Sequence, residues 1–126
     1  MSNETVPQFS SYISEFCQMI EQAKQDYTWN QEEISRLDKL TQDYLHKLEL
    51  ENLNYNERAK LATQLAKCRR LRRESKDTVE ILSPLIGYLE TERGKQTVNL
   101  LKETLGKTRR VEENMKTRTY RYKIIK

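Results

Sequence analysis

Between Leu61 and Leu89, residues recur with a strict alternation of four and three positions, all of them apolar except Arg72 and Ser75. A repeat of this period keeps one stripe of a helix against a neighbouring helix, as in a coiled coil. The stripe therefore predicts a long helix that packs along another helix. We refer to its members as the seam: Leu61, Leu65, Cys68, Arg72, Ser75, Val79, Leu82, Ile86 and Leu89.

The ends of this helix are marked by local residue patterns. Asn54 followed by Glu57 has the spacing of a capping box, in which each side chain satisfies a free backbone amide of the other residue. Pro84 removes one amide donor, so the element is either one bent helix to about Arg93 or two pieces that meet near Pro84. Gly94 is expected to end it.

Apolar residues at helical spacing predict three further helices, over residues 8–27, 31–51 and 95–116. Asn30 and Glu33 repeat the capping pattern and predict a break at residues 28–30. The expected fold is all-α: an antiparallel helical bundle or coiled-coil hairpin of about four helices. Residues 1–116 would form one helical domain. Residues 117–126 would form an extended basic tail, because apolar and cationic side chains alternate there.

Composition excludes several classes of protein. The chain has 126 residues, of which 33% are charged, with 3 Gly and 2 Pro. It contains no apolar run of membrane-spanning length, and its first residues lack the pattern of a signal peptide. We therefore expect a cytoplasmic protein with no membrane partner, in which Cys17 and Cys68 are reduced thiols.

The sequence offers little for catalysis. His46 is the only histidine, and Asp43 and Glu49 lie near it at helical spacing. This arrangement is more typical of a solvated helix face than of a metal or acid–base site. A Gly-rich phosphate loop, a nucleophile elbow and the common metal motifs are all absent from the sequence. The sequence predicts no enzyme, no cofactor and no metal.

Charge is unevenly distributed. Residues 1–58 carry 5 Lys/Arg and 11 Asp/Glu, whereas residues 59–126 carry 18 and 8. Six cations occur within ten residues: Lys67, Arg69, Arg70, Arg72, Arg73 and Lys76. They would bind nucleic-acid phosphate, pair with carboxylates of a protein partner, or pair internally with the acidic first half. The seam position of Arg72 favours some internal pairing, since a core-facing guanidinium needs an acceptor.

The C-terminal region is the second basic feature. Aromatic rings among cations are typical of proteins that bind single-stranded nucleic acid, although a solubilising tail is the alternative. The candidate residues are Arg109, Arg110, Arg118, Tyr120, Arg121, Tyr122 and Lys123. Trp29 and Tyr55, in or beside the predicted links, are candidate protein contacts. A hydrophobic cap on the core explains these two equally well.

Residues 38–50, the Arg-Arg-x-Arg-Arg of residues 69–73, and Pro84-Leu85 resemble a family of small, largely uncharacterised helical proteins. These proteins are encoded by phages and mobile elements of Gram-positive bacteria. The resemblance covers about two-thirds of the chain and assigns no functional residue. It implies a protein that acts in the host cytoplasm on a host or phage protein of nucleic-acid metabolism or defence.

The sequence thus predicts a non-catalytic interaction protein that binds a macromolecular partner, with an anti-CRISPR-type inhibitor as one concrete instance. Direct binding of DNA or RNA through the arginine cluster and the tail is the alternative. A structural role as a coiled-coil homodimer is the third hypothesis.

Overall fold

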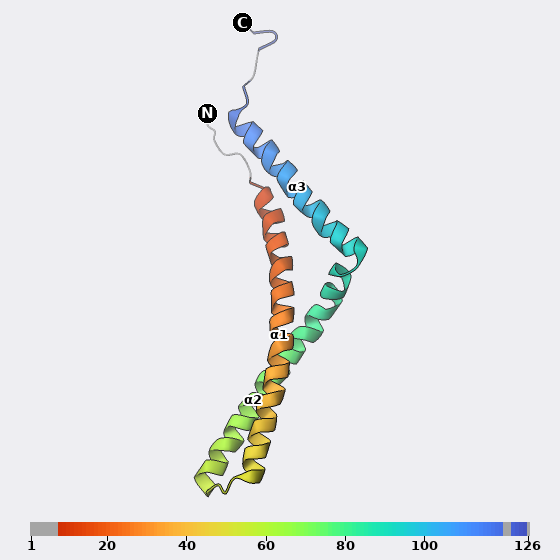
Figure 1. Cartoon of the computed structure of the whole chain (residues 1–126). Helices are drawn as coiled ribbons and strands as arrows, with labels where there is room; N and C mark the ends of the chain where they lie inside the picture. Colours follow the sequence, from red (N-terminus) through yellow and green to blue (C-terminus); the bar gives the residue numbers. More distant parts are fainter. Residues whose placement is uncertain (1–7, 120–121, 126) are drawn as a thin grey trace. The chain divides into compact units, whose positions relative to one another are not determined.

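The computed structural model, which describes residues 8–119 and 122–125, contains three α-helices and no strand within those residues (Figure 1). These are α1 (Ser10–Leu50), α2 (Tyr55–Leu89) and α3 (Glu92–Thr117). The predicted all-α class is confirmed, and the predicted number of about four helices is wrong. No helix in the described part of the chain is both long and apolar enough to cross a membrane.

The first correction concerns α1, which replaces two predicted helices by one of 41 residues. Asn30 does not start a helix; its side-chain amide donates to the Asp26 carbonyl at 2.8 Å. Glu33 pairs with Arg36 at 2.6 Å instead of capping. No Gly or Pro interrupts residues 27–34, so a break would have sacrificed backbone hydrogen bonds with nothing to compensate for them.

The second capping pattern is confirmed. The Asn54 amide donates to Glu57 Oε1 at 3.1 Å, and the Glu57 amide donates to Asn54 Oδ1 at 2.8 Å. Leu53, immediately before this box, is buried. The link between α1 and α2 therefore ends in a complete capping box, and the buried Leu53 side chain holds the link against the helices.

The second correction lies between α2 and α3. Helix α2 continues through Pro84 as one helix and ends at Leu89, earlier than the predicted Arg93. Gly94 does not end it. Thr91 caps α3 instead, with its hydroxyl accepting from the Gly94 amide at 3.0 Å. A capping hydroxyl satisfies an amide that the first turn leaves free, so α3 begins at Glu92, ahead of the predicted Lys95.

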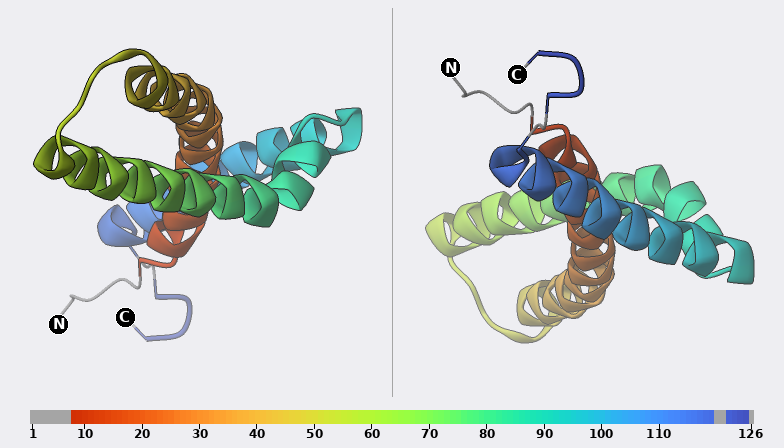
Figure 2. Two further views of the ribbon diagram at one scale, coloured as in Figure 1. Left: turned by 90° about the horizontal axis from the view of Figure 1, so that it is seen from below. Right: turned by 90° about the horizontal axis from the view of Figure 1, so that it is seen from above.

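The helices group into two compact units, and Gln22–Tyr88 forms unit 2. Within it, the later part of α1 and α2 lie side by side and antiparallel, joined by residues 51–54 (Figures 1 and 2). The eight seam residues from Leu61 to Ile86, which belong to unit 2, are buried or half-buried, and Leu89, in unit 1, is buried as well. On α1, Leu37 is almost completely buried opposite them. The period of the seam therefore predicted the buried stripe of α2 correctly.

Unit 1 comprises Met1–Glu21 and Leu89–Lys126. Its two helical segments are antiparallel, since Ser10 bonds to Glu112 and the later Ser14 accepts from the earlier Arg109. Its core is small: the buried apolar residues in its described part are Ile20, Leu89 and Val98. The prediction of a single domain over residues 1–116 stays a prediction.

The residues after α3 are described in part. Arg118 has an extended backbone, with φ −67° and ψ 146°. Residues 122–125 are exposed and adopt neither helix nor strand. Tyr120, Arg121 and Lys126 of the predicted tail lie outside the described residues.

The two Asn-x-x-Glu patterns give a direct test of the helix boundaries. Asn54→Ala should lower the free energy of unfolding by about 1 kcal/mol, because it removes a helix cap. Asn30→Ala should cost less, since Asn30 lies inside α1 and makes only an exposed contact to Asp26. Thermal unfolding followed by circular dichroism measures both. Equal losses would contradict the continuous α1.

Candidate partner-binding surface

The cationic cluster of α2 is neutralised only in part. Arg72 Nε donates to Asp38 Oδ1 at 2.5 Å, and its side chain is 25% exposed. Arg69 Nη1 lies 4.0 Å from the same oxygen. Asp38 belongs to the acidic first half of the chain. The charge of Arg72 is therefore paired internally, as its seam position favoured. Arg69 lies at the distance limit of an ion pair with the same carboxylate.

Polar contacts continue one turn along the seam. The Cys68 thiol donates to the Leu37 carbonyl at 3.4 Å, and the Thr41 hydroxyl donates to the same carbonyl at 2.9 Å. Cys68 Sγ and Thr41 Oγ1 are 3.4 Å apart. Buried polar contacts of this kind favour one register between two paired helices. They hold Arg72 opposite Asp38.

Other cations of the cluster point away from the seam. Successive helical residues are about 100° apart, which places Arg70 and Arg73 on the side of α2 opposite the seam. Both are exposed, as is Lys67. In the part of the chain that the structure describes, none of these three forms an ion pair. We call them the outer cations; Lys76, the sixth member of the cluster, is half-buried.

Apolar side chains accompany the outer cations. Ile81 is 76% exposed and lies about three helical turns beyond Arg70 on the same side of α2. Leu71 is also exposed, on the flank of α2 next to Lys67, four residues before it. This side of α2 therefore combines arginine with aliphatic surface, a composition found in the cores of protein interfaces.

The other predicted contact residues are dispersed. Trp29 lies inside α1, not in a link, and is exposed, while Tyr55 is the exposed first residue of α2. Arg109 Nη2 donates to Ser14 Oγ at 3.4 Å. All described members of the C-terminal set are exposed: Arg109, Arg110, Arg118, Tyr122 and Lys123. The C-terminal set belongs to unit 1, whereas Trp29, Tyr55 and the α2 cluster belong to unit 2.

Metal ligands are not brought together in the described residues. His46 is exposed on α1, and no group of three or more His, Cys, Asp or Glu there is placed to hold a metal ion. Cys17 and Cys68 are free thiols.

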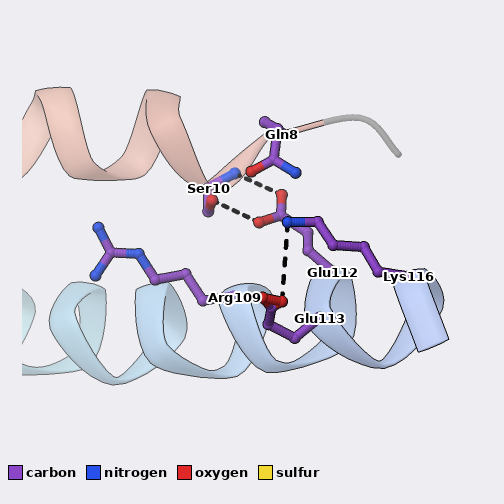
Figure 3. A pocket seen from close by; sticks show the side chains of 6 residues that line it. All are labelled: Gln8, Ser10, Arg109, Glu112, Glu113 and Lys116. Atoms are coloured by element: carbon purple, nitrogen blue, oxygen red, sulfur yellow. Dashed lines mark hydrogen bonds and ion pairs between the residues drawn. The ribbon is translucent and has the colours of Figure 1, made fainter. Parts of the chain in front are cut away.

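A buried carboxylate at the start of α1 was missed by the sequence analysis (Figure 3). Glu112 of α3 accepts from the Ser10 hydroxyl at 2.6 Å and from the Ser10 amide at 3.0 Å. The first turn of α1 contains no acidic residue, so Glu112 supplies from another helix the negative charge that a helix N-terminus favours. A pocket of about 250 Å³ adjoins this contact, lined by Gln8, Ser10, Arg109, Glu112, Glu113 and Lys116.

The environment of Glu112 lowers the pKa of its carboxyl group. The hydrogen bonds from the Ser10 hydroxyl and amide, with the attraction of Lys116, outweigh the opposing effect of burial. The sequence carried a weak signal for this role. Leu105, Thr108 and Glu112 continue the three-four spacing of the buried stripe of α3, whereas the apolar Val111 and Met115 are exposed.

Comparisons with protein-family models, with curated proteins and with solved structures found no match to this chain. The resemblance to proteins of phages and mobile elements therefore stays a prediction.

Acidification should test the contact between Ser10 and Glu112. A carboxyl group with a lowered folded-state pKa contributes stability above its ordinary value, here 4.5, and loses that contribution as pH falls through the lower folded value. Glu112→Gln should therefore be less stable than the wild type near pH 7. That difference should shrink below about pH 4.5, as thermal unfolding across pH would measure. A difference that does not change with pH would contradict this role.

The pair of Asp38 and Arg72 should respond differently to loss of either partner. Asp38→Ala leaves a half-buried guanidinium without its acceptor and should cost about 1 kcal/mol. Arg72→Met keeps an unbranched side chain in the seam and should be nearly neutral, because it removes the charge together with the need for an acceptor. Urea unfolding measures both. An Arg72→Met variant as unstable as Asp38→Ala would contradict this account.

Proposed function

We propose that this chain is a non-catalytic binding protein that docks the outer face of α2 on an acidic surface of a partner protein. The partner would be a host or phage protein of nucleic-acid metabolism or defence, and an anti-CRISPR-type inhibitor is one instance. The observation that carries the proposal is that Lys67, Arg70 and Arg73 are exposed without an ion pair in the described part of the chain.

Local electrostatics support an external partner for these cations. The acidic half of the chain neutralises Arg72 directly, through Asp38. Arg70 and Arg73 turn away from Asp38. Glu74 and Asp77 lie four residues after them on the same side of α2, yet no ion pair joins these acids to the two arginines in the described part of the chain, so both guanidinium groups are open to an outside anion. Arginine also suits carboxylates particularly well, because its planar fork donates two parallel hydrogen bonds.

Exposed aliphatic surface favours a protein over bare phosphate as that partner. Leu71 lies one turn from Lys67, and Ile81 lies about three turns beyond Arg70 on the same side of α2. A phosphate backbone gives such side chains little apolar surface to contact. Protein–protein interfaces combine apolar surface with arginine, whereas nucleic-acid interfaces are more polar and more uniformly positive. The mixed surface of α2 corresponds better to the first kind.

Direct binding of DNA or RNA is the second candidate, and the C-terminal residues favour it. Arg118, Tyr122 and Lys123 are exposed beyond α3, which is suitable for base stacking and phosphate contact. Binding by this route would weaken steeply as salt rises. An absence of any mobility shift with DNA or RNA at low salt would exclude it.

The outer cations can be tested by charge reversal. Arg70→Glu with Arg73→Glu should abolish nuclease-resistant capture of the partner from a Gram-positive host lysate. Once the partner is identified by mass spectrometry, the same change should weaken binding by roughly tenfold or more in a direct titration, because it replaces attraction by repulsion.

The matched control is Arg58→Glu with Lys60→Glu, which changes the charge of α2 by the same amount outside the cluster. These residues are also exposed, and their reversal should leave capture intact. Equal loss in both double variants would indicate non-specific attraction and contradict the proposed face. Ile81→Ser should weaken binding without changing its dependence on salt, since it removes apolar contact alone.

A further inference from the structure

Unit 1 leaves a row of large apolar side chains uncovered on α1. The row begins one residue before the helix and follows a three-four-three spacing through Phe9, Tyr12, Phe16 and Met19. These side chains are between 47% and 67% exposed. The rings of Phe9 and Tyr12 lie with their centroids 6.0 Å apart. Such spacing places all four on one stripe of the helix.

Helix α3 carries a matching row. Val111 and Met115 are exposed, about a quarter turn from the stripe of α3 that includes the buried Val98 and Glu112. The exposed row of α1 is offset from its own buried positions, Ser10 and Ile20, by about the same angle and in the same rotational sense.

These offsets place both rows on one side of the helix pair. Two antiparallel helices that face each other are related by a two-fold rotation about an axis perpendicular to their common plane. That rotation keeps each side of the pair on the same side. Equal offsets in the same sense therefore combine the two rows into a single face, which we call the unit 1 face: Phe9, Tyr12, Phe16, Met19, Val111 and Met115.

We propose that the unit 1 face binds the same face of a second copy of this chain. Two copies related by a two-fold axis parallel to the helices would form an antiparallel four-helix arrangement, in which α1 of each copy packs on α3 of the other. This inference concerns unit 1 alone and does not depend on the outer cations of α2.

The exposed area is on the scale that such a dimer needs. An aromatic side chain buries roughly 150–250 Å², so the exposed fractions of Phe9, Tyr12 and Phe16 correspond to roughly 350 Å² of ring surface. Two copies would bury about 700 Å² from these rings, of the roughly 1,000 Å² expected of a specific interface. Met19, Val111 and Met115 add to that area on each copy.

Charge at the edge of the unit 1 face selects a second copy over an unrelated helix. Ser10 and Glu112 are level with each other across the pair. Glu15 lies five residues along α1 from Ser10, and Lys107 lies five residues back along α3 from Glu112, so these two are also level. Both are exposed, on the outer edges of the face. The two-fold axis would bring Glu15 of each copy beside Lys107 of the other.

Sedimentation of the full chain tests the dimer. The wild type should approach twice its monomer mass of 15.1 kDa as its concentration rises from about 1 to 100 µM, a range suited to micromolar affinity. Tyr12→Glu should remain monomeric across that range. Trp29→Glu should dimerise like the wild type, because Trp29 is similarly exposed on the same helix but lies outside unit 1.

Charge exchange tests the identity of the occupant and the symmetry. Glu15→Lys and Lys107→Glu should each weaken the dimer by roughly three- to tenfold through like-charge repulsion. The double variant Glu15→Lys with Lys107→Glu should restore dimerisation. This test does not depend on the folding of Tyr12→Glu. A wild type that stays at the monomer mass, a Trp29→Glu variant as monomeric as Tyr12→Glu, or a double variant that does not recover would each overturn the proposal.

Discussion

Two paired helices can bury only one stripe of each, and the rest of this structure depends on that constraint. In unit 2 the seam residues from Leu61 to Ile86 form the buried stripe of α2. Apart from the half-buried Lys76, Thr78 and Leu85, the other side chains of α2 are exposed and face solvent or an outside partner, whatever their polarity. The outer cations, Ile81 and the unit 1 face are the residues that this geometry leaves uncovered. A bundle with a fourth helix, as the sequence predicted, would have had further interfaces in which to bury such side chains.

The seam was predictable because it depends on period alone, whereas helix boundaries depend on what the chain does on both sides. Asn54 caps α2 because Leu53 is buried in a non-helical link before it. Asn30 has the same local pattern, yet the buried and half-buried positions of α1 continue through it from Tyr27 to Ile34. A capping box stabilises a helix start. It does not produce a break in the helix where an uninterrupted helix keeps more backbone hydrogen bonds and more buried side chains.

The candidate sites were predictable to the extent that their chemistry is local. A guanidinium at a seam position needs an acceptor, and this much followed for Arg72 from spacing. That the acceptor is Asp38, 34 residues earlier in the chain, depends on the register between helices, which the sequence does not encode locally. The contact of Ser10 with Glu112 joins residues 102 positions apart. Only the antiparallel course of α1 and α3 brings this carboxylate to the start of α1.

The two uncovered surfaces differ in chemistry, and this difference separates their associations physically. The outer cations would bind through charge, an attraction that salt screens over distances of about 10 Å. The unit 1 face would bind through apolar area, which salts such as sulfate strengthen rather than weaken. Because the two surfaces share no residue, one association can be suppressed by salt or by substitution while the other persists. Self-association through unit 1 would double the number of α2 surfaces per assembly, so even a weak electrostatic contact would gain from bivalent attachment.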